Sequence, residues 1–169
     1  MFNLQFCPNC GEKELQYNGR KMHCSNCGFV FYNNTAAAVA VIIRKGDEIL
    51  MARRNRNPSK GKLDLAGGFI DFHETAEEAA CREIAEELQI HLDKTQLKYL
   101  GSFPNIYVFN DIQYHTMDLF YEYKAHEDWE FHLEKDEIAE VLWFKKSEFP
   151  IEELAFESQK MFFKEYLKK

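Results

Sequence analysis

The spacing of apolar positions changes several times along the chain, and each change predicts an element. Residues 35–44 are almost continuously apolar, and a second apolar stretch at 49–54 follows the polar turn KGDE. Short continuous runs bounded by a turn are typical of strands, so we predict a β-hairpin whose first strand is buried on both faces. Two further stretches, 97–109 and 112–125, flank Asn110-Asp111 and predict a second pair of strands.

The remaining segments predict helices, one more strand and loops. Helical spacing of apolar residues predicts one helix from Thr75 to Leu88 and an amphipathic helix over 150–169. Residues 138–144 read as a strand, with a loop over 127–137. Strands that surround one central and one terminal helix define a mixed α/β class.

Composition and charge narrow the possible partners. The 169 residues include 15 phenylalanines and carry a net charge of −7, which indicates a folded domain with little affinity for nucleic acid or anionic lipid. The first residues lack the pattern of a secretory signal, and the longest apolar run, AAAVAVII, is too short to span a bilayer. We therefore expect a cytoplasmic protein with no membrane partner.

Four cysteines form two C-x-x-C pairs within residues 1–34, a segment we predict to be a separate module from residues 35–169. Cys7 and Cys10 form one pair, and Cys24 and Cys27 form the other. Four thiolates at this spacing favour a closed, structural Zn²⁺ site. A thioredoxin-like redox pair would need one such motif, and four incidental thiols explain the doubled spacing poorly. The module resembles a zinc ribbon, but it lacks the basic surface that nucleic-acid binding requires.

Three glutamates crowd one arc of the central helix. Glu83, Glu86 and Glu87 are neighbours at i, i+3 and i+4, a spacing at which like charges destabilise a helix. An ordinary solvated face would place Lys or Arg four residues after each glutamate, whereas this chain has Glu87, Ile90 and His91 there. The cluster therefore predicts a site for Mg²⁺ or Mn²⁺, with a plain solvated face as the alternative.

The segment GGFIDFHETAEEAACREIAEELQI resembles the Nudix box, in which Gly, five residues, Glu and seven residues lead to R-E-U-x-E-E-x-G-U. The matching positions are Gly68, Glu74, Arg82, Glu83, Ile84, Glu86, Glu87 and Ile90. The single departure is Gln89, where the family has Gly, and we expect it to change the helix end slightly while activity is retained. The resemblance implies a Nudix α/β/α sandwich with a small N-terminal zinc-ribbon module.

The same resemblance implies roles for individual residues. Glu83 and Glu87 would be the principal Mg²⁺ ligands, and Glu86 a further ligand or the residue that orients water. Arg82 would fix the carboxylates, and the backbone carbonyl of Ala66 or Gly67 would complete the shell. In zinc-ribbon Nudix enzymes that hydrolyse NADH, a Glu before a strand ending in Trp-Phe supports the metal site; Glu140 takes that place here, with Glu137 as the substitute.

A zinc ribbon joined to such a domain resembles the NADH pyrophosphatase branch. That branch carries S-Q-P-W-P-F-P-x-S after the box, of which GSFPNIYVFN keeps only Ser102 and Pro104. ADP-ribose or another nucleoside diphosphate linked to a second group is thus at least as well supported as NADH. Phe103, Tyr107 and Phe109 are candidates for stacking on a base, and core or cross-strand packing is the alternative for them.

Three classes of function remain to be compared. The first is a Mg²⁺-dependent pyrophosphohydrolase acting on a small nucleotide derivative. The second is a nucleotide sensor that binds without cleaving, which would predict broken box glutamates. The third is a nucleic-acid adaptor or a cap-removing enzyme, for which the charge balance provides no basic channel. Dimerisation through the N-terminal module is expected only by similarity.

Overall fold

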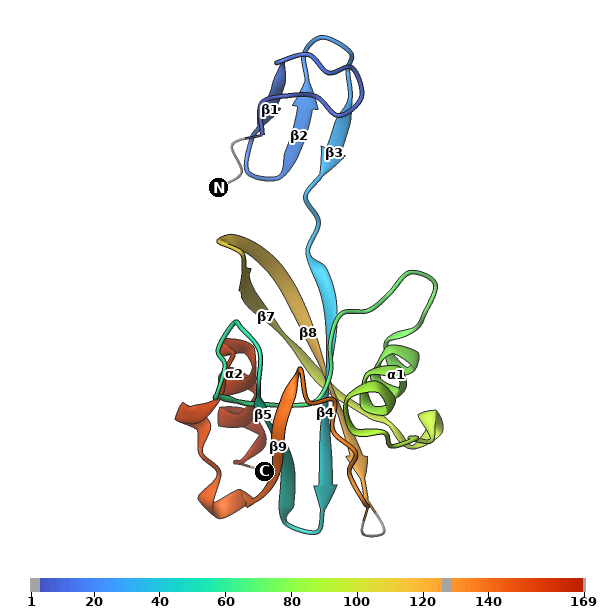
Figure 1. The fold of residues 1–169 in the computed structure, drawn as a ribbon, viewed down its shortest axis with the longest axis vertical. Coiled ribbons are helices and arrows are strands. Elements are labelled where there is room, and N and C mark those ends of the chain that lie inside the picture. Colours follow the sequence, from blue (N-terminus) through green and yellow to red (C-terminus); the bar gives the residue numbers. More distant parts are fainter. Residues whose placement is uncertain (1–3, 126–128, 169) are drawn as a thin grey trace.

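The computed structural model describes residues 4–125 and 129–168 and contains two β-sheets (Figure 1). The smaller sheet is antiparallel and consists of β1 (Leu15–Tyr17), β2 (Lys21–Cys24) and β3 (Val30–Tyr32). An extended segment joins it to the larger body, from which it stands apart in Figure 1. The domain boundary after residue 34 stays a prediction.

The larger sheet has the strand order β6-β5-β4-β8-β7, and β9 pairs with β5. Its strands are β4 (Ala36–Lys45), β5 (Glu48–Arg54), β6 (Leu63–Asp64), β7 (Lys98–Phe109), β8 (Ile112–Lys124) and β9 (Ile138–Lys145). Both predicted hairpins are confirmed, because β4–β5 and β7–β8 pair in antiparallel fashion. The parallel pairing of β4 with β8 joins the two hairpins into one sheet.

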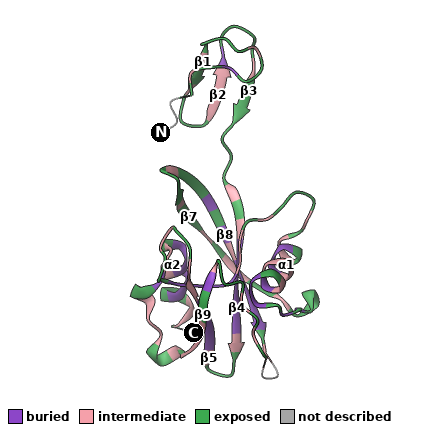
Figure 2. Cartoon of the chain, in the orientation of Figure 1, coloured by how far each residue is buried: buried purple, intermediate pink, exposed green. Residues whose placement is uncertain are grey.

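Two helices cover opposite faces of this sheet, α1 (Ala76–Leu88) and α2 (Glu157–Tyr166) (Figure 1). Strand β4 serves both layers: Val39, Val41 and Ile43 pack in the α1 core, while Ala40 and Ile42 pack in the α2 core. This alternation explains why the strand is apolar on both faces, and Figure 2 shows its buried centre. The predicted α/β/α sandwich is confirmed.

Helix α1 begins and ends at residues whose side chains and backbone suit those positions. Thr75 is the N-cap, and its side chain and that of Glu78 form a reciprocal capping box. Gln89 ends the helix with φ 56° and ψ 38°, and its N–H donates to the Ala85 carbonyl. The expectation of an altered helix end was wrong, because Gln89 adopts the left-handed conformation that glycine usually supplies.

The C-terminal helix is shorter than the pattern predicts. A 3₁₀ turn (Ile151–Glu153) comes first, and α2 starts only at Glu157. Between them the chain is extended, since Leu154 forms a parallel bridge with Leu63 and the Ala155 N–H donates to the Leu63 carbonyl. Backbone pairing with β6 thus overrides helical propensity here; Lys169, at the end of the predicted helix, lies outside the described residues.

Two other expectations concern the 127–137 loop and membrane insertion. Residues 129–137 form no helix or strand, as predicted, whereas the start of that segment lies outside the described residues. Within the described ranges, no helix has the length and apolar character needed to cross a membrane.

Candidate active site and zinc centre

The four predicted cysteines converge in the N-terminal module. Their sulfur atoms all lie within 4.8 Å of one another; the Cys7–Cys27 and Cys10–Cys24 Sγ separations are 3.6 and 3.7 Å. A tetrahedral Zn²⁺ with bonds of about 2.3 Å holds its sulfurs about 3.8 Å apart. The donor set and its spacing therefore fit Zn²⁺.

Backbone and amide donors surround these sulfurs. The N–H groups of Gly11 and Gly28 donate to the carbonyls of Cys7 and Cys24, which closes the two C-x-x-C turns. The side-chain amide of Asn9 donates to Cys27 Sγ at 3.5 Å. This hydrogen bond, followed by one from the Phe29 backbone, lowers the pKa of Cys27 to about 6. Such donors favour the thiolate that a metal requires.

The loop that precedes α1 is pressed against β4. The Val39 N–H donates to the Gly68 carbonyl at 2.8 Å, and the Val41 N–H donates to the Ala66 carbonyl at 3.0 Å. A Cβ on Gly67 would lie 2.1 Å from the Val39 carbonyl oxygen. Only glycine permits this approach, which places the first residues of the box beside the helix.

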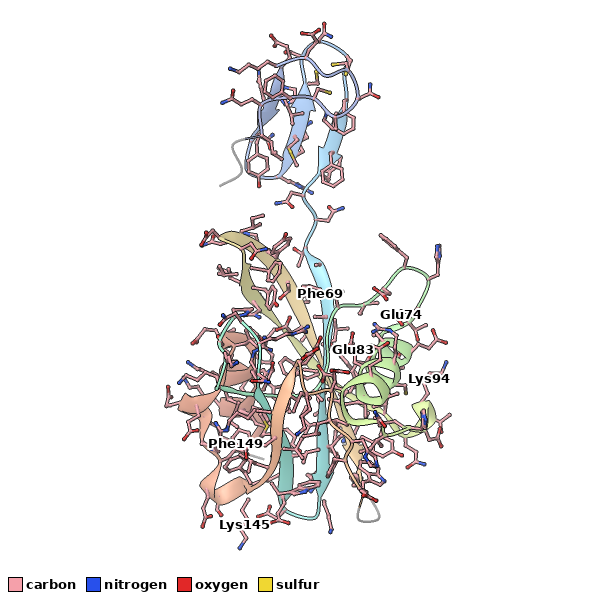
Figure 3. The ribbon with its side chains drawn as sticks, viewed as in Figure 1. Phe69, Glu74, Glu83, Lys94, Lys145 and Phe149 are labelled. Atoms are coloured by element: carbon pink, nitrogen blue, oxygen red, sulfur yellow. The ribbon has the colours of Figure 1, made fainter. Side chains whose placement is uncertain are left out.

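Arg82 joins this loop to the helix. Its guanidinium donates to both Glu74 oxygens at 3.1 and 2.7 Å and to the Phe69 carbonyl at 3.0 Å. It also donates to Glu83 at 2.8 Å and to Glu86 at 3.1 Å. The Arg82 hydrogen bonds lower the pKa of Glu74. The guanidinium therefore holds loop and helix carboxylates in one arrangement; Figure 3 labels Glu74 and Glu83.

Glu87 is a buried carboxylate with little compensation. It is 8% exposed, and its Oε2 accepts the Gly67 N–H at 3.1 Å. Burial raises its pKa well above the ordinary value, and the nearby charges of Asp64 and Glu83 raise it further. Burial also raises the pKa of Glu83. Carboxylates that lie close together, and whose negative charges are poorly neutralised, favour binding of a divalent cation.

The box residues thus fit Mg²⁺ chemically: Glu83, Glu86 and Glu87 are hard oxygen donors, and the Ala66 carbonyl lies just before the box. Among the described residues, however, only the cysteines gather three or more ligand atoms at one point. Arg82 holds Glu83 and Glu86 by their oxygens, so these carboxylates would have to turn to share a cation.

A pocket of about 230 Å³ opens beside the box between the sheet and the start of α2. Three aromatic side chains line it, with Tyr107 edge-on to Phe69 (ring centroids 5.7 Å) and tilted against Phe156 (5.9 Å). Glu83 also lines it. Figure 3 labels Phe69 and Glu83. Aromatic walls leading to acidic groups suit a base joined to phosphates.

Two buried acids add polar groups to this pocket. Asp118 accepts hydrogen bonds from Thr116 at 2.8 Å and Ser158 at 2.5 Å. Asp64 accepts from Arg54 and Gln159, each at 2.5 Å. Sequence reasoning missed these residues, although an Asp between two leucines in KLDLAGG is a detectable signal for Asp64.

The structure separates the three predicted aromatic residues. Tyr107 lines the pocket, but Phe103 packs in the α2 core with ring centroids 6.0 Å from Phe120 and 6.2 Å from Phe162. Phe109 is 47% exposed at the far end of β7 and does not line the pocket. Phe103 therefore fits the alternative of core packing. Phe69 and Phe156, rather than Phe103 and Phe109, line the pocket with Tyr107.

Glu140 and Glu137 lie at different places relative to the box. Glu140 is an ion-pair partner of Arg53 at 2.7 Å and lies outside the pocket linings around the box. Glu137 lines a small recess with Glu87 and forms an ion pair with Arg56. Its charge contributes to raising the pKa of Glu87. The geometry thus places Glu137, the substitute candidate, beside the box.

The fold and this box define the class of protein. The chain belongs to the NUDIX domain family, whose model matches residues 33–164. It is similar to the NAD-capped RNA hydrolase NudC of Vibrio vulnificus (strain CMCP6), at 29% identity over 153 residues, 87% of this chain and 53% of the relative. The NudC of Haemophilus influenzae (strain PittGG) is 31% identical over 153 residues, 89% of this chain and 54% of the relative. The chain therefore spans about half the length of these relatives.

Solved structures agree on the fold. A NUDIX hydrolase from Nitrosomonas europaea superposes with a TM-score of 0.69 and 24% identity, over 98% of this chain and 91% of that one. The NUDIX domain of Shewanella oneidensis NrtR, complexed with ADP ribose, gives a TM-score of 0.56 at 17% identity, over 69% and 76% of the two chains. Identities this low establish shared architecture alone.

Proposed function

We propose that this protein is a Mg²⁺-dependent pyrophosphohydrolase that cleaves the diphosphate of a nucleoside diphosphate linked to a second group, with ADP-ribose or an NADH-like dinucleotide as substrate. The observation that carries the proposal is the buried Glu87 beside Glu83 and Asp64, next to a pocket with aromatic walls. The relatives named for hydrolysis of NAD-capped RNA support an NAD-like substrate. Because that substrate is attached to RNA, the negative net charge is no ground for excluding a nucleic-acid-borne dinucleotide.

Each part of the site has a task in this proposal. Glu83 and Glu87 would hold Mg²⁺, with Glu86 as a further ligand or the group that orients water, and Arg82 would orient Glu83 and Glu86. Bound Mg²⁺ would neutralise the diphosphate and make its phosphorus more open to attack by water. Tyr107, with Phe69 and Phe156, would stack on the base.

The N-terminal module has a structural task in the same proposal. Zn²⁺ on Cys7, Cys10, Cys24 and Cys27 would hold the small sheet together. Reduced thiolates are the reason for proposing a cytoplasmic location. Dimerisation through this module stays a prediction.

Hydrolysis of a substrate panel tests the proposal. ADP-ribose, NADH, diadenosine polyphosphates and nucleoside triphosphates are assayed with Mg²⁺, using wild type, Glu87→Gln and the control Glu77→Gln. Glu77 lies on the same helix but bonds to the Tyr121 hydroxyl at 2.8 Å, away from the pocket. We expect metal-dependent cleavage of one linked diphosphate, at least about 100-fold slower in Glu87→Gln and unchanged in Glu77→Gln. Tight binding without turnover of any compound would instead favour a nucleotide sensor.

A further inference from the structure

Arg56 occupies the junction between two hollows of the site. It lines the aromatic pocket, and it also lines the small recess that contains Glu87, Asp64 and Glu137. A nucleotide whose base lies against Tyr107, and whose phosphates lie between Glu83 in the pocket and Glu87 in the recess, would place a phosphate at this junction. The Arg56 guanidinium is therefore placed to meet a phosphate.

The two nearby arginines, Arg53 and Arg54, are each paired with a carboxylate, although Arg54 Nη2 has no hydrogen-bond partner among the described residues. Arg54 is 10% exposed at its side chain and donates to Asp64 at 2.5 Å and to the Pro58 carbonyl at 2.9 Å. Arg53 is bound to Glu140 and to the Gly61 carbonyl at 3.0 Å. The Arg56 side chain is 49% exposed and forms an ion pair with Glu137. An ion pair this exposed contributes little stability, so it can be exchanged at low cost.

The backbone on both sides of this pair is fixed. The Asn55 N–H donates to the Glu137 carbonyl at 2.7 Å, which ties the arginine-bearing loop to the turn before β9. The Glu134 N–H donates to the Glu87 carbonyl at 3.0 Å, which ties the same turn to α1. Arg56 and Glu137 can therefore change partners by side-chain rotation alone.

We propose that Arg56 and Glu137 form an exchangeable pair: Arg56 leaves Glu137 for a phosphate of the substrate, and Glu137 then turns to the cation held by Glu83 and Glu87. This inference rests on the proposed function and adds a phosphate-positioning residue to it. A guanidinium can form bidentate hydrogen bonds with two phosphate oxygens, which favours the transfer of Arg56 from Glu137 to a phosphate. The exchange leaves the charge of Glu137 beside Glu87, where a divalent cation compensates it. Substrate and metal binding are thereby coupled.

The first test measures binding of α,β-methylene ADP, a non-hydrolysable diphosphate, by calorimetry in the presence of EDTA. The proteins are wild type, Arg56→Ala, Glu137→Gln and the double variant, with Arg53→Ala, near the end of β5, as the control. We expect Arg56→Ala to bind about tenfold or more weakly, and Glu137→Gln to bind more tightly because Arg56 is released. Arg53→Ala should bind like wild type.

The double variant separates an exchange from simple electrostatics. If Glu137 acts by holding Arg56, its substitution should improve binding only while Arg56 is present, so the double variant should match Arg56→Ala. An equal improvement in both backgrounds would show that Glu137 merely repels the ligand, and the exchange would be wrong. Unchanged binding in Arg56→Ala would also overturn it.

A second readout concerns the metal. Glu137→Gln should raise the Mg²⁺ concentration needed for half-maximal binding of the analogue several-fold, because a ligand of the cation is lost. An unchanged Mg²⁺ requirement would show that Glu137 is not a ligand of the cation. If wild type fails to bind the analogue with or without Mg²⁺, the proposed function itself is wrong. If wild type binds the analogue and neither substitution changes the affinity, only the proposed exchange is wrong.

Discussion

At the scale of single residues, two adjacent glycines have different neighbours. A Cβ on Gly67 would meet the Val39 carbonyl oxygen at 2.1 Å, and the residue has φ +148°. A Cβ on Gly68 would meet Glu83 Oε1 at 2.6 Å. The first obstacle is backbone of a central strand, whereas the second is the end of a flexible side chain. Glycine at position 67 is therefore required by the fold, whereas glycine at position 68 leaves room for the side chain of Glu83, a proposed metal ligand.

This contrast predicts opposite outcomes for two alanine substitutions. Gly67→Ala should lower the free energy of unfolding by more than about 2 kcal/mol, because the loop must move away from β4. Gly68→Ala should cost less than about 1 kcal/mol but slow hydrolysis about tenfold or more, because Glu83 is displaced. Urea denaturation and the ADP-ribose assay distinguish the two. Equal losses of stability would contradict this view of the loop.

At the scale of elements, the first residues of α1 stabilise the helix, and its middle carries residues of the proposed site. Glu78 accepts the Thr75 N–H at 2.9 Å in the capping box and pairs with Lys94 at 2.9 Å. The Thr75 backbone hydrogen bond, followed by the Lys94 interaction, lowers the pKa of Glu78 to about 2. One helical turn later, Arg82 and Glu83 are the first residues of α1 that belong to the proposed metal site. The charges at the helix start therefore stabilise the element on which the site is built.

The lowered pKa gives a pH dependence with a definite sign. A carboxyl with a lower pKa in the folded state contributes stability above its unfolded pKa, near 4.5, and loses that contribution as the pH falls toward 2. Glu78→Gln keeps the capping hydrogen bond without the charge, so its stability should fall less steeply across this window. Urea unfolding between pH 5 and 2, for both proteins, measures the difference. Parallel curves would mean that the ionised Glu78 contributes nothing.

At the scale of the whole molecule, the N-terminal module and the NUDIX domain contain separate sheets joined by a short segment (Figure 1). Strand β3 of the module is exposed throughout, with Val30, Phe31 and Tyr32 at 45–53% exposure. Figure 2 colours this strand as exposed. So small a sheet has little core of its own, and bound metal would supply most of its folding free energy. The NUDIX domain has two cores that contain none of the four clustered cysteines.

Loss of the zinc ligands should therefore unfold one part only. We expect the Cys7→Ser/Cys24→Ser variant to lose one Zn²⁺ per chain and the amide signals of β1–β3, while the midpoint of the main thermal transition moves by less than about 4 °C. Native mass spectrometry, NMR and calorimetry measure the three quantities. Cys81→Ser, which changes the one cysteine outside the cluster, should retain its zinc. Full zinc occupancy in the double variant would disprove the proposed ligands.

Much of the architecture and part of the site could be predicted from the chain because they depend on local spacing. The hairpins, α1 and the gathering of Cys7, Cys10, Cys24 and Cys27 follow from turns, periodicity and C-x-x-C pairs. The role of Arg82 in fixing the carboxylates was implied by the resemblance to the Nudix box and not by local spacing. Left-handed Gln89 was not predictable, since a non-Gly residue adopts that conformation only when the surrounding structure requires it.

The sequence by itself therefore determined the fold class, the zinc cluster and the line of glutamates, all of which depend on residues close together in the chain. Only the tertiary structure decided the rest of the site. The pocket walls come from distant segments, so Phe69 and Phe156 join Tyr107 while Phe103 enters the core. A register shift at Arg53/Arg54 pairs Arg53 with Glu140 and Arg54 with Ile138. Glu140 therefore pairs with Arg53 on β5, whereas Glu137, in the turn before β9, is held beside the box by contacts with the distant Asn55–Arg56 segment, which local sequence spacing does not reveal.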